Sequence, residues 1–275
     1  MDTNRSESRV EKGKDLRIGI IGGAGWLGGA MAAAMLDAGV VAPENLALSY
    51  RTTRPNRFSR AFWTTDNQTL ADRSDIIILS IRPADWQDLT MTAEGKLVIS
   101  VMAGIRLAAL GNRHRTHRAV RALPNAAAEA RKSYTPWLAA DGIDDADRAI
   151  VRAIFDACGV QDEVRSEAEI DYLTGLTGSG PAFPALLADA MMTDAISRGL
   201  DPRVARRAVN MLLVGAGRML EQRDDCPTET VKTFLGYRGT TAAAIETMTS
   251  AGFRAAVAQG LAAAYEKSLH LGDAS

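Results

Sequence analysis

Three glycines, at positions 23, 25 and 28, have the spacing in this chain that points most directly to a chemical task. They form a G-x-G-x-x-G pattern between a β-branched run, Ile18 to Ile21, and a helical stretch that ends at Gly39. A strand, turn and helix of this kind directs free N–H groups and the positive end of the helix dipole toward a pyrophosphate. Gly23 is expected to allow the sharp turn, Gly25 the close approach of the backbone, and Gly28 close packing of helix on strand. The predicted pyrophosphate-binding residues are Gly23, Ala24, Gly25, Trp26, Leu27 and Gly28.

The loop after the predicted second strand, residues 45–50, indicates which dinucleotide would bind. An acidic residue at this place accepts hydrogen bonds from the free ribose hydroxyls of NAD, whereas basic and hydroxyl groups suit the extra phosphate of NADP. No Asp or Glu stands between Leu46 and Thr65. NADPH is therefore the predicted cofactor, with NADH as the alternative donor, and a solvated basic loop is the competing interpretation. The loop offers Ser49, Arg51, Thr52, Thr53, Arg54 and Arg57, of which Ser49, Arg51, Thr52 and Arg54 are the predicted contacts.

Three later segments read as buried strands that alternate with helical stretches: residues 75–83, 96–102 and 118–124. This alternation predicts an α/β fold with a Rossmann-type, doubly wound parallel sheet. Because ligands of such sheets lie outside the carboxyl ends of the strands, residues at two of these ends are predicted to face the cofactor. They are Ser80, Ile81, Arg82, Pro83 and Asn125.

Shorter elements complete this half of the chain. A short strand is expected around residues 61–64, a helix over 144–157 and a strand-like run over 159–164. Residues 134–139 are predicted to form a strand at the edge of the sheet, because Pro136 cannot donate a hydrogen bond to a ladder.

From Glu167 onward apolar residues recur at helical spacing, and no further strand is expected. The first predicted helix is apolar nearly all round, so it must be buried on every side, which a small helical domain cannot do alone. A homodimer through this domain, or a larger assembly built on it, is therefore predicted. The helices are expected at residues 183–196 (capped by Gly199), 202–220, 228–235, 240–249 and 253–271. The predicted organisation is a disordered extension at 1–15, an NADP-binding Rossmann domain at 16–166 and an all-α dimerisation and substrate domain at 167–275.

Composition argues against several other classes of protein. A net charge of -1 over 275 residues gives no support for binding to nucleic acid or to an anionic membrane. The charged N-terminus lacks the apolar segment of a signal peptide, and two distant cysteines, Cys158 and Cys226, fit a reducing compartment. A cytoplasmic location and a small-molecule substrate are therefore expected. No metal site is predicted, because His114 and His117 stand in a basic segment that would repel a cation.

Two glycine-containing turns in the helical half are candidates for substrate binding. Ser179 and Gly180 precede Pro181 at one predicted helix start, and Gly239, Thr240 and Thr241 begin another. Each turn directs free N–H groups and hydroxyls outward, which suits a carboxylate. Ordinary helix N-caps are the competing interpretation.

Four segments in this order resemble the pyrroline-5-carboxylate reductase family: residues 21–28, 64–83, 120–125 and 171–183, the last of which contains Gly-Ser-Gly-Pro-Ala-Phe. A fifth, residues 238–254, falls where the family keeps its signature. The resemblance implies a Rossmann domain followed by a helical dimerisation domain, NADPH as the usual donor, and reduction of the cyclic imine 1-pyrroline-5-carboxylate to L-proline. It also implies an active site completed by the helical domain of the second subunit. Asn67 is then a cofactor contact, and Thr241 is the catalytic residue near the imine nitrogen.

The chain departs from the family pattern at the turn before that threonine. The family usually shows Ser-Pro-Gly-Gly there, and this chain has Gly-Tyr-Arg-Gly at residues 236–239. Arg238 brings charge and volume to the predicted substrate carboxylate, which it either pairs with or crowds. A different cyclic imine or carbonyl substrate is therefore one alternative, and a non-catalytic NADP-binding sensor is another.

Imine reduction asks little of the side chains. A protonated cyclic imine is already electrophilic, so the reaction needs mainly orientation and a hydrogen bond near the nitrogen. A β-hydroxyacid dehydrogenase of similar two-domain build would instead need a lysine in the first long helix of the helical half to move the alcohol proton. Residues 178–199 contain no lysine, which favours the imine.

Overall fold

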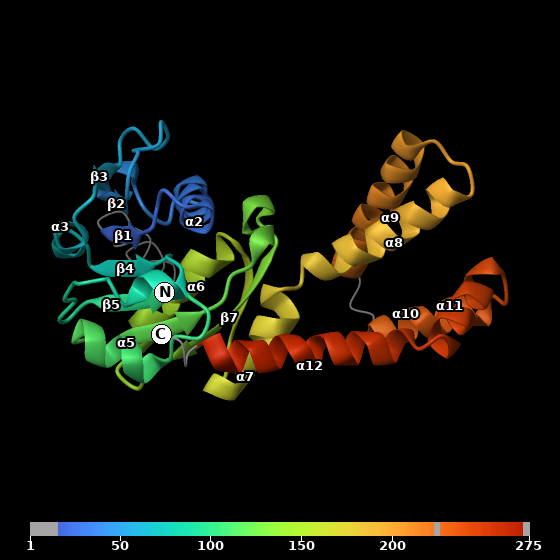
Figure 1. Cartoon of the computed structure of the whole chain (residues 1–275). Coiled ribbons are helices and arrows are strands. Elements are labelled where there is room, and N and C mark those ends of the chain that lie inside the picture. The colour runs from blue at the N-terminus through green and yellow to red at the C-terminus, as the bar shows by residue number, and fades with distance from the viewer. Residues whose placement is uncertain (1–15, 223–225, 272–275) are drawn as a thin grey trace, which may run out of the picture. The chain divides into compact units, whose positions relative to one another are not determined.

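The computed structural model describes residues 16–222 and 226–271, and the predicted extension at 1–15 lies outside them. The chain divides into two compact units (Figure 1). The first comprises residues up to Ser179 together with residues from Ala264 on, and the second comprises Gly180–Ala263.

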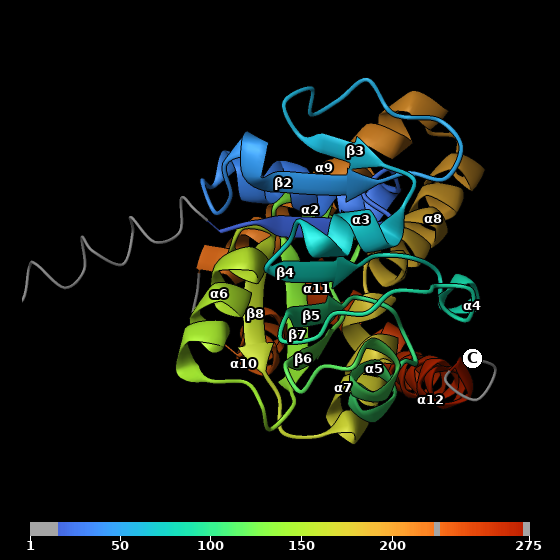
Figure 2. The same cartoon turned by 90° about the vertical axis from the view of Figure 1, so that its left-hand side faces the viewer.

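The first unit is built on an eight-stranded sheet with the order β3-β2-β1-β4-β5-β6-β7-β8 (Figure 2). Every neighbouring pair is parallel except β6 and β7, which are antiparallel. The predicted doubly wound Rossmann-type sheet is therefore confirmed. Its strands are β1 (Ile18–Ile21), β2 (Leu46–Ser49), β3 (Phe62–Thr64), β4 (Ile76–Leu79), β5 (Leu97–Ser100), β6 (Ala119–Ala122), β7 (Ser133–Ala139) and β8 (Gly159–Glu163).

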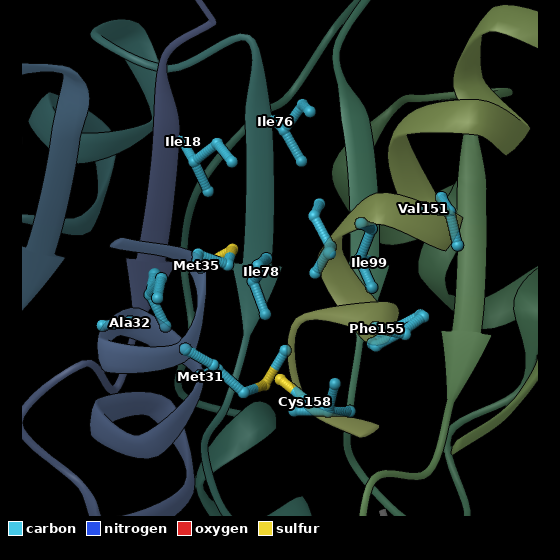
Figure 3. Close-up of a cluster of buried hydrophobic side chains, with 14 of the residues drawn as sticks. Ile18, Met31, Ala32, Met35, Ile76, Ile78, Ile99, Val151, Phe155 and Cys158 are labelled. Carbon is cyan, nitrogen blue, oxygen red and sulfur yellow. The ribbon is translucent and has the colours of Figure 1, made fainter. Parts of the chain in front are cut away.

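Helices cover the sheet, and two of them supply much of its core. Figure 3 shows Met31 and Met35 of α2 and Phe155 of α6 pointing toward the strand residues Ile78 and Ile99. All five side chains are fully buried, and each contributes about 1.5–3 kcal/mol through burial of apolar surface. The helices of this unit are α2 (Trp26–Asp37), η1 (Pro43–Asn45), α3 (Asn67–Asp72), α4 (Pro83–Trp86), α5 (Leu107–His114), η2 (Ala126–Ala130), α6 (Asp145–Asp156), α7 (Glu167–Leu173) and the π-helical turn η3 (Thr174–Gly178).

The prediction that residues 134–139 form an edge strand is wrong. β7 lies between β6 and β8, and β8 is the edge. Pro136 is tolerated there because its carbonyl accepts from the Leu123 N–H, one residue beyond the end of β6. The missing proline N–H therefore falls at the end of the β6–β7 ladder rather than inside it.

The second unit is helical throughout its described residues, as predicted. Within it α8 packs against α9, and α10 packs against α11. Gly199 adopts φ 92° just after α8, which makes it the expected C-terminal stop. The helices are α8 (Ala182–Ser197), α9 (Pro202–Gln222), α10 (Pro227–Gly236), α11 (Thr240–Ser250) and the first part of α12 (Phe253–Leu271), whose end belongs to the first unit. Among residues 16–222 and 226–271, none of the helices is both long and apolar enough to cross a membrane.

A buried ion-pair network joins the sheet to α7. Arg121 on β6 is fully buried and contacts the carboxylates of Glu167 and Asp171, the latter at 2.6 Å from Nη2. Asp171 is itself buried, and its carbonyl accepts a hydrogen bond of 2.8 Å from the hydroxyl of Ser268 on α12. The other carboxylate oxygen of Glu167 accepts from the N–H of Leu107 at the start of α5. The Arg121 guanidinium thus ties α7 to the sheet, and Glu167 and Asp171 of α7 in turn bond to α5 and α12.

A second buried polar contact supports the segment after β4. Trp86 donates from Nε1 to Nε2 of His114 over 3.3 Å, so Nδ1 of this histidine carries the proton and donates to the Met91 carbonyl at 3.3 Å. The pKa of His114 is held below its ordinary value, first by burial and then by the neighbouring charge of Arg113. The neutral imidazole is therefore part of the folded state.

We expect the free energy of unfolding of the first unit to fall as the pH is lowered from about 7 to about 5. Since the folded pKa of His114 is depressed, the unfolded imidazole binds a proton below its ordinary pKa of about 6.5 while the folded one resists it. Stability is therefore complete above this pH and declines by up to about 1.4 kcal/mol per pH unit below it. Urea unfolding followed by tryptophan fluorescence measures this, because Trp26, Trp63, Trp86 and Trp137 all lie in the first unit.

The matched variants are His114→Gln and His117→Gln. Glutamine at position 114 offers a donor and an acceptor but does not titrate in this range, so this variant should lose most of the pH dependence. His117 is exposed, and its variant should keep the wild-type slope. An equal slope in wild type and His114→Gln would show that this buried imidazole is not the titrating group.

Candidate functional site

A cleft of about 710 Å³ lies in the first unit at the carboxyl ends of β1 to β4. Its walls come from the segments that follow these four strands, which is where a doubly wound sheet places its ligand. The predicted site residues that line it are Ala24, Gly25, Ser49, Arg51, Thr52, Asn67, Ser80, Ile81 and Arg82. Lining residues outside that prediction include Gly22, Tyr50, Thr53, Pro55, Thr65, Asp85, Asp88 and Leu89.

The sharp turn after β1 is made by Gly22 and not, as predicted, by Gly23. Gly22 has φ 86°, and a Cβ there would collide with the carbonyl of Ser80, the residue just after β4. Only glycine satisfies both conditions without strain. Gly23 has ordinary φ, and a Cβ on it would meet the side chain of Leu48. The G-x-G-x-x-G spacing begins at Gly23, one residue after the glycine that makes the turn.

The glycine turn leads directly into α2, which begins at Trp26. Gly25 is the N-cap and makes no side-chain cap, so the first amides of α2 face outward without an intrahelical acceptor. Gly28 allows close packing as predicted, since a Cβ there would overlap the carbonyl of Gly22. Leu27 lies with Trp26 in the first helical turn. This geometry suits an anion such as a pyrophosphate.

Ser49 connects the end of β2 to the same turn. Its hydroxyl oxygen accepts from the Gly22 N–H at 2.9 Å, and its carbonyl accepts from the Ala24 N–H at 3.0 Å. The residue is buried and lines the cleft. Ser49 therefore fixes the shape of the glycine turn beside the cleft.

Two arginines in the cleft share one carboxylate. Arg82 donates to Asp85 at 2.8 Å and 3.0 Å, and Arg51 lies 3.2 Å from the same carboxylate. Hydrogen bonding from Arg82, reinforced by Arg51, lowers the pKa of Asp85, so this group is ionised near neutral pH. Asp85 was not predicted as a site residue. The spacing of Arg82 and Asp85, three residues apart across the start of α4, is the signal that could have identified it.

Other predicted cofactor residues are placed differently. Asn67 is the first residue of α3 and lines the cleft, whereas Arg54 and Pro83 are not among its lining residues. Arg57, in the same basic loop, donates instead to the carbonyls of the glycine turn.

Asn125 does not line the cleft. Its side-chain oxygen accepts from the Ala127 N–H, and its amide donates to the Thr177 carbonyl at 2.9 Å. It therefore holds the π-helical turn Thr174–Gly178 against the end of β6. Turns of this type are frequent at functional sites, and this one leads directly to Ser179.

The remaining predicted substrate residues lie at the starts of α8 and α11. Gly180 is two residues before α8, and Gly239 is the N-cap of α11, with Thr240 and Thr241 in its first turn. Arg238 has φ 50°, a left-handed conformation that glycine adopts freely and that costs an arginine about 1–2 kcal/mol. The turn therefore keeps a glycine-type backbone with an arginine in it. The substrate-binding roles of these residues stay predictions.

The cleft is thus suited to an elongated anionic ligand. The first turn of α2 supplies uncapped amides, and Arg51 and Arg82 supply positive charge at the other wall. A dinucleotide phosphate fits this set of donors, because a pyrophosphate suits the helix start and a further phosphate suits the guanidinium groups.

Comparisons with solved structures show the fold. A pyrroline carboxylate reductase of Plasmodium falciparum, determined with NADP bound, has a TM-score of 0.81 at 22% identity and covers 94% of this chain and 99% of its own. A pyrroline-5-carboxylate reductase of Coxiella burnetii has a TM-score of 0.83 at 24% identity, over the same shares of the two chains.

Sequence comparisons show the family. Residues 167–271 match the model of the pyrroline-5-carboxylate reductase dimerisation domain, and residues 17–104 match that of the coenzyme F420-dependent NADP oxidoreductase domain. The pyrroline-5-carboxylate reductase of Synechocystis sp. is 28% identical over 94% of this chain and 98% of its own length. That of Methanosarcina acetivorans is 31% identical over 93% of this chain and 98% of its own length. With a relative this similar over its full length, the chain belongs to the pyrroline-5-carboxylate reductase family.

Proposed function

We propose that this protein reduces 1-pyrroline-5-carboxylate to L-proline with NADPH as the donor. The observation that carries this proposal is the full-length similarity to a pyrroline-5-carboxylate reductase at 31% identity, together with a cleft of matching chemistry at the ends of β1 to β4. When bound, NADPH supplies the hydride. The protein is an oxidoreductase acting on a C=N bond.

The residues of the cleft would hold and orient the cofactor. The first turn of α2, which begins just after Gly25, offers amides to the pyrophosphate, and Ser49 fixes the glycine turn that leads into it. Arg51 stands at the end of β2, where a doubly wound fold receives the extra phosphate of NADP. Backbone amides and one charged loop would therefore bind the cofactor. The main contribution of the protein to the rate of hydride transfer would be the orientation of the cofactor against the substrate.

The substrate would be held by the first turn of α11. Its amides and the hydroxyl of Thr241 suit a carboxylate and a protonated imine nitrogen, and Arg238 adds a positive charge beside them. We therefore assign substrate binding, together with dimerisation, to a domain of residues 167–275. The match of residues 167–271 to the family's dimerisation model supports this assignment.

The assembly is a homodimer through the helical half. Support comes from the dimerisation model and from α8, which has no buried residue in the single chain although it is apolar on nearly every side. Leu186 is 70% exposed, and Met211 and Val214 of α9 are exposed as well. A partner subunit would cover such a surface.

We also assign the protein to the cytoplasm, which suits its two unbridged cysteines, Cys158 and Cys226.

The test is oxidation of NADPH by purified protein with 1-pyrroline-5-carboxylate and a panel of other cyclic imines. Turnover of the first substrate with proline as product is the expected result. Turnover of another imine alone would reject the proline assignment but keep the reaction class. Cofactor binding without turnover of any imine would point to a sensor.

We predict that Asp85→Asn raises the preference for NADPH over NADH. The carboxylate holds Arg51 and Arg82, so the extra phosphate of NADPH competes with it, while the free ribose hydroxyls of NADH can donate to it. The ratio of kcat/KM for NADPH to that for NADH should rise about threefold to tenfold. Arg51→Ala should move the ratio in the opposite direction.

The control for this prediction is Glu44→Gln. It removes one carboxylate that pairs with Arg60 outside the lining of the cleft, so the ratio should not change. A lower ratio in Asp85→Asn would mean that the carboxylate helps to bind the phosphate by orienting the two arginines.

We predict that Thr241→Ala lowers kcat/KM for the imine about tenfold, the effect of one lost hydrogen bond in the transition state. The dissociation constant for NADPH, measured by fluorescence titration, should not change. The matched control is Thr249→Ala, at an exposed position near the other end of α11. Equal kcat/KM in wild type and Thr241→Ala would remove this hydroxyl from the reaction.

A further inference from the structure

The basic loop after β2 contains an arginine that turns away from the cleft. Nη2 of Arg57 lies 3.3 Å from the carbonyl oxygen of Gly23 and 3.1 Å from those of Ala24 and Gly25. Arg57 is not among the residues that line the cleft. One guanidinium nitrogen therefore contacts three consecutive carbonyls of the glycine turn from behind.

Arg57 adds a donor to a turn whose own amides are already bonded. The N–H groups of Gly23, Ala24 and Gly25 donate to carbonyls within the first unit, and the amides left for an anion are those of the first turn of α2. A donor with several N–H groups in a rigid fork is suited to bind the three carbonyls together, and its charge strengthens each bond. The positive charge also lies beside the start of α2, whose first amides would bind a pyrophosphate.

The loop and the helix are both shaped to hold the guanidinium there. The next residue, Phe58, has φ 54°, a conformation that a bulky side chain keeps only when its surroundings enforce it. Its side chain packs on the main core, and its carbonyl accepts from Trp63 Nε1 at 3.3 Å. On α2, a Cβ at Gly29 would overlap the guanidinium of Arg57. The glycine therefore leaves room for the arginine.

We propose that Arg57 is a positioning residue that holds the glycine turn in its pyrophosphate-binding shape, with Gly29 providing the space for it. The inference rests on the proposed dinucleotide cofactor and adds a residue that does not itself touch the ligand. Because the pyrophosphate is common to both dinucleotides, loss of the clamp should weaken NADPH and NADH alike. A residue that binds the extra phosphate would affect NADPH alone.

The test measures dissociation constants of NADPH and NADH by fluorescence titration of the full chain. Arg57→Ala should raise both constants by a similar factor, about tenfold, with kcat at saturating cofactor unchanged. Arg57→Lys, which keeps the charge on a single ammonium, should give an intermediate value. Arg51→Ala should raise the constant for NADPH alone. Arg60→Ala is the matched control, because it removes the same charge from the same loop while its partner is Glu44.

Gly29→Ala separates this role from general stability. Alanine favours a helix interior over glycine, so the thermal unfolding temperature should not fall. Both dissociation constants should nevertheless rise as in Arg57→Ala, and the double variant should be no worse than either single one. A Gly29→Ala protein with wild-type affinity would contradict the proposal.

Two other outcomes would overturn it. Wild-type affinities in Arg57→Ala would show that the turn keeps its shape without the clamp. A loss confined to NADPH would make Arg57 a phosphate contact. If the wild-type protein bound neither dinucleotide, the proposed function itself would be contradicted. This outcome differs from failure of the Arg57 proposal because the wild-type protein alone reveals it.

Discussion

The fold of the first unit depends on how it accommodates a charge in the middle of its sheet. Arg121 is 0% exposed on β6 and pairs with Glu167 and Asp171, which stand one helical turn apart on the same face of α7. Loss of one partner of such a buried pair typically costs about 3–5 kcal/mol, so α7 cannot leave the sheet without leaving a buried charge unpaired. Four residues after Arg121, Asn125 holds the carbonyl of Thr177. The end of β6 therefore fixes the whole path from α7 through the π-helical turn to Ser179.

The charged residues in and around the cleft are also paired with one another. Arginines of one loop take different tasks: Arg51 faces the cleft, Arg57 supports the glycine turn from behind, and Arg60 pairs with Glu44 away from both. Asp85 compensates the two arginines that face the cleft, so the site is not a simple positive patch. A phosphate that bound these arginines would have to compete with this carboxylate, so we expect cofactor preference to depend on the balance between these groups rather than on Arg51 alone.

Elements with strong periodicity were predictable from the sequence, and contacts between distant residues were not. The strands around Ile78 and Ile99 and the helices from α8 to α12 follow local patterns, so they were predicted within a few residues. The turn glycine was missed because the G-x-G-x-x-G spacing fits Gly23, and only the neighbouring carbonyl of Ser80 shows that Gly22 makes the turn. Residues 134–139 were expected at the edge of the sheet because proline is excluded from the interior of a ladder. Pro136 stands at the end of the β6–β7 ladder, where a proline is tolerated. The hydrogen bond from the Asn125 amide to the Thr177 carbonyl joins residues far apart in the chain, and no local pattern indicates it.

The turn at residues 236–239 departs from the sequence that the family usually shows. Arg238 stands where the family usually has a glycine, and it has a left-handed φ of 50°. A residue kept in such a conformation against a cost of about 1–2 kcal/mol is held by its surroundings. The first turn of α11, with Gly239 and Thr241, is therefore presented as a glycine-containing turn would present it. What changes is chemical: a guanidinium and the 74% exposed ring of Tyr237 now flank that turn. Added positive charge favours a carboxylate-bearing imine over a neutral one, which argues for a retained acidic substrate rather than a lost activity.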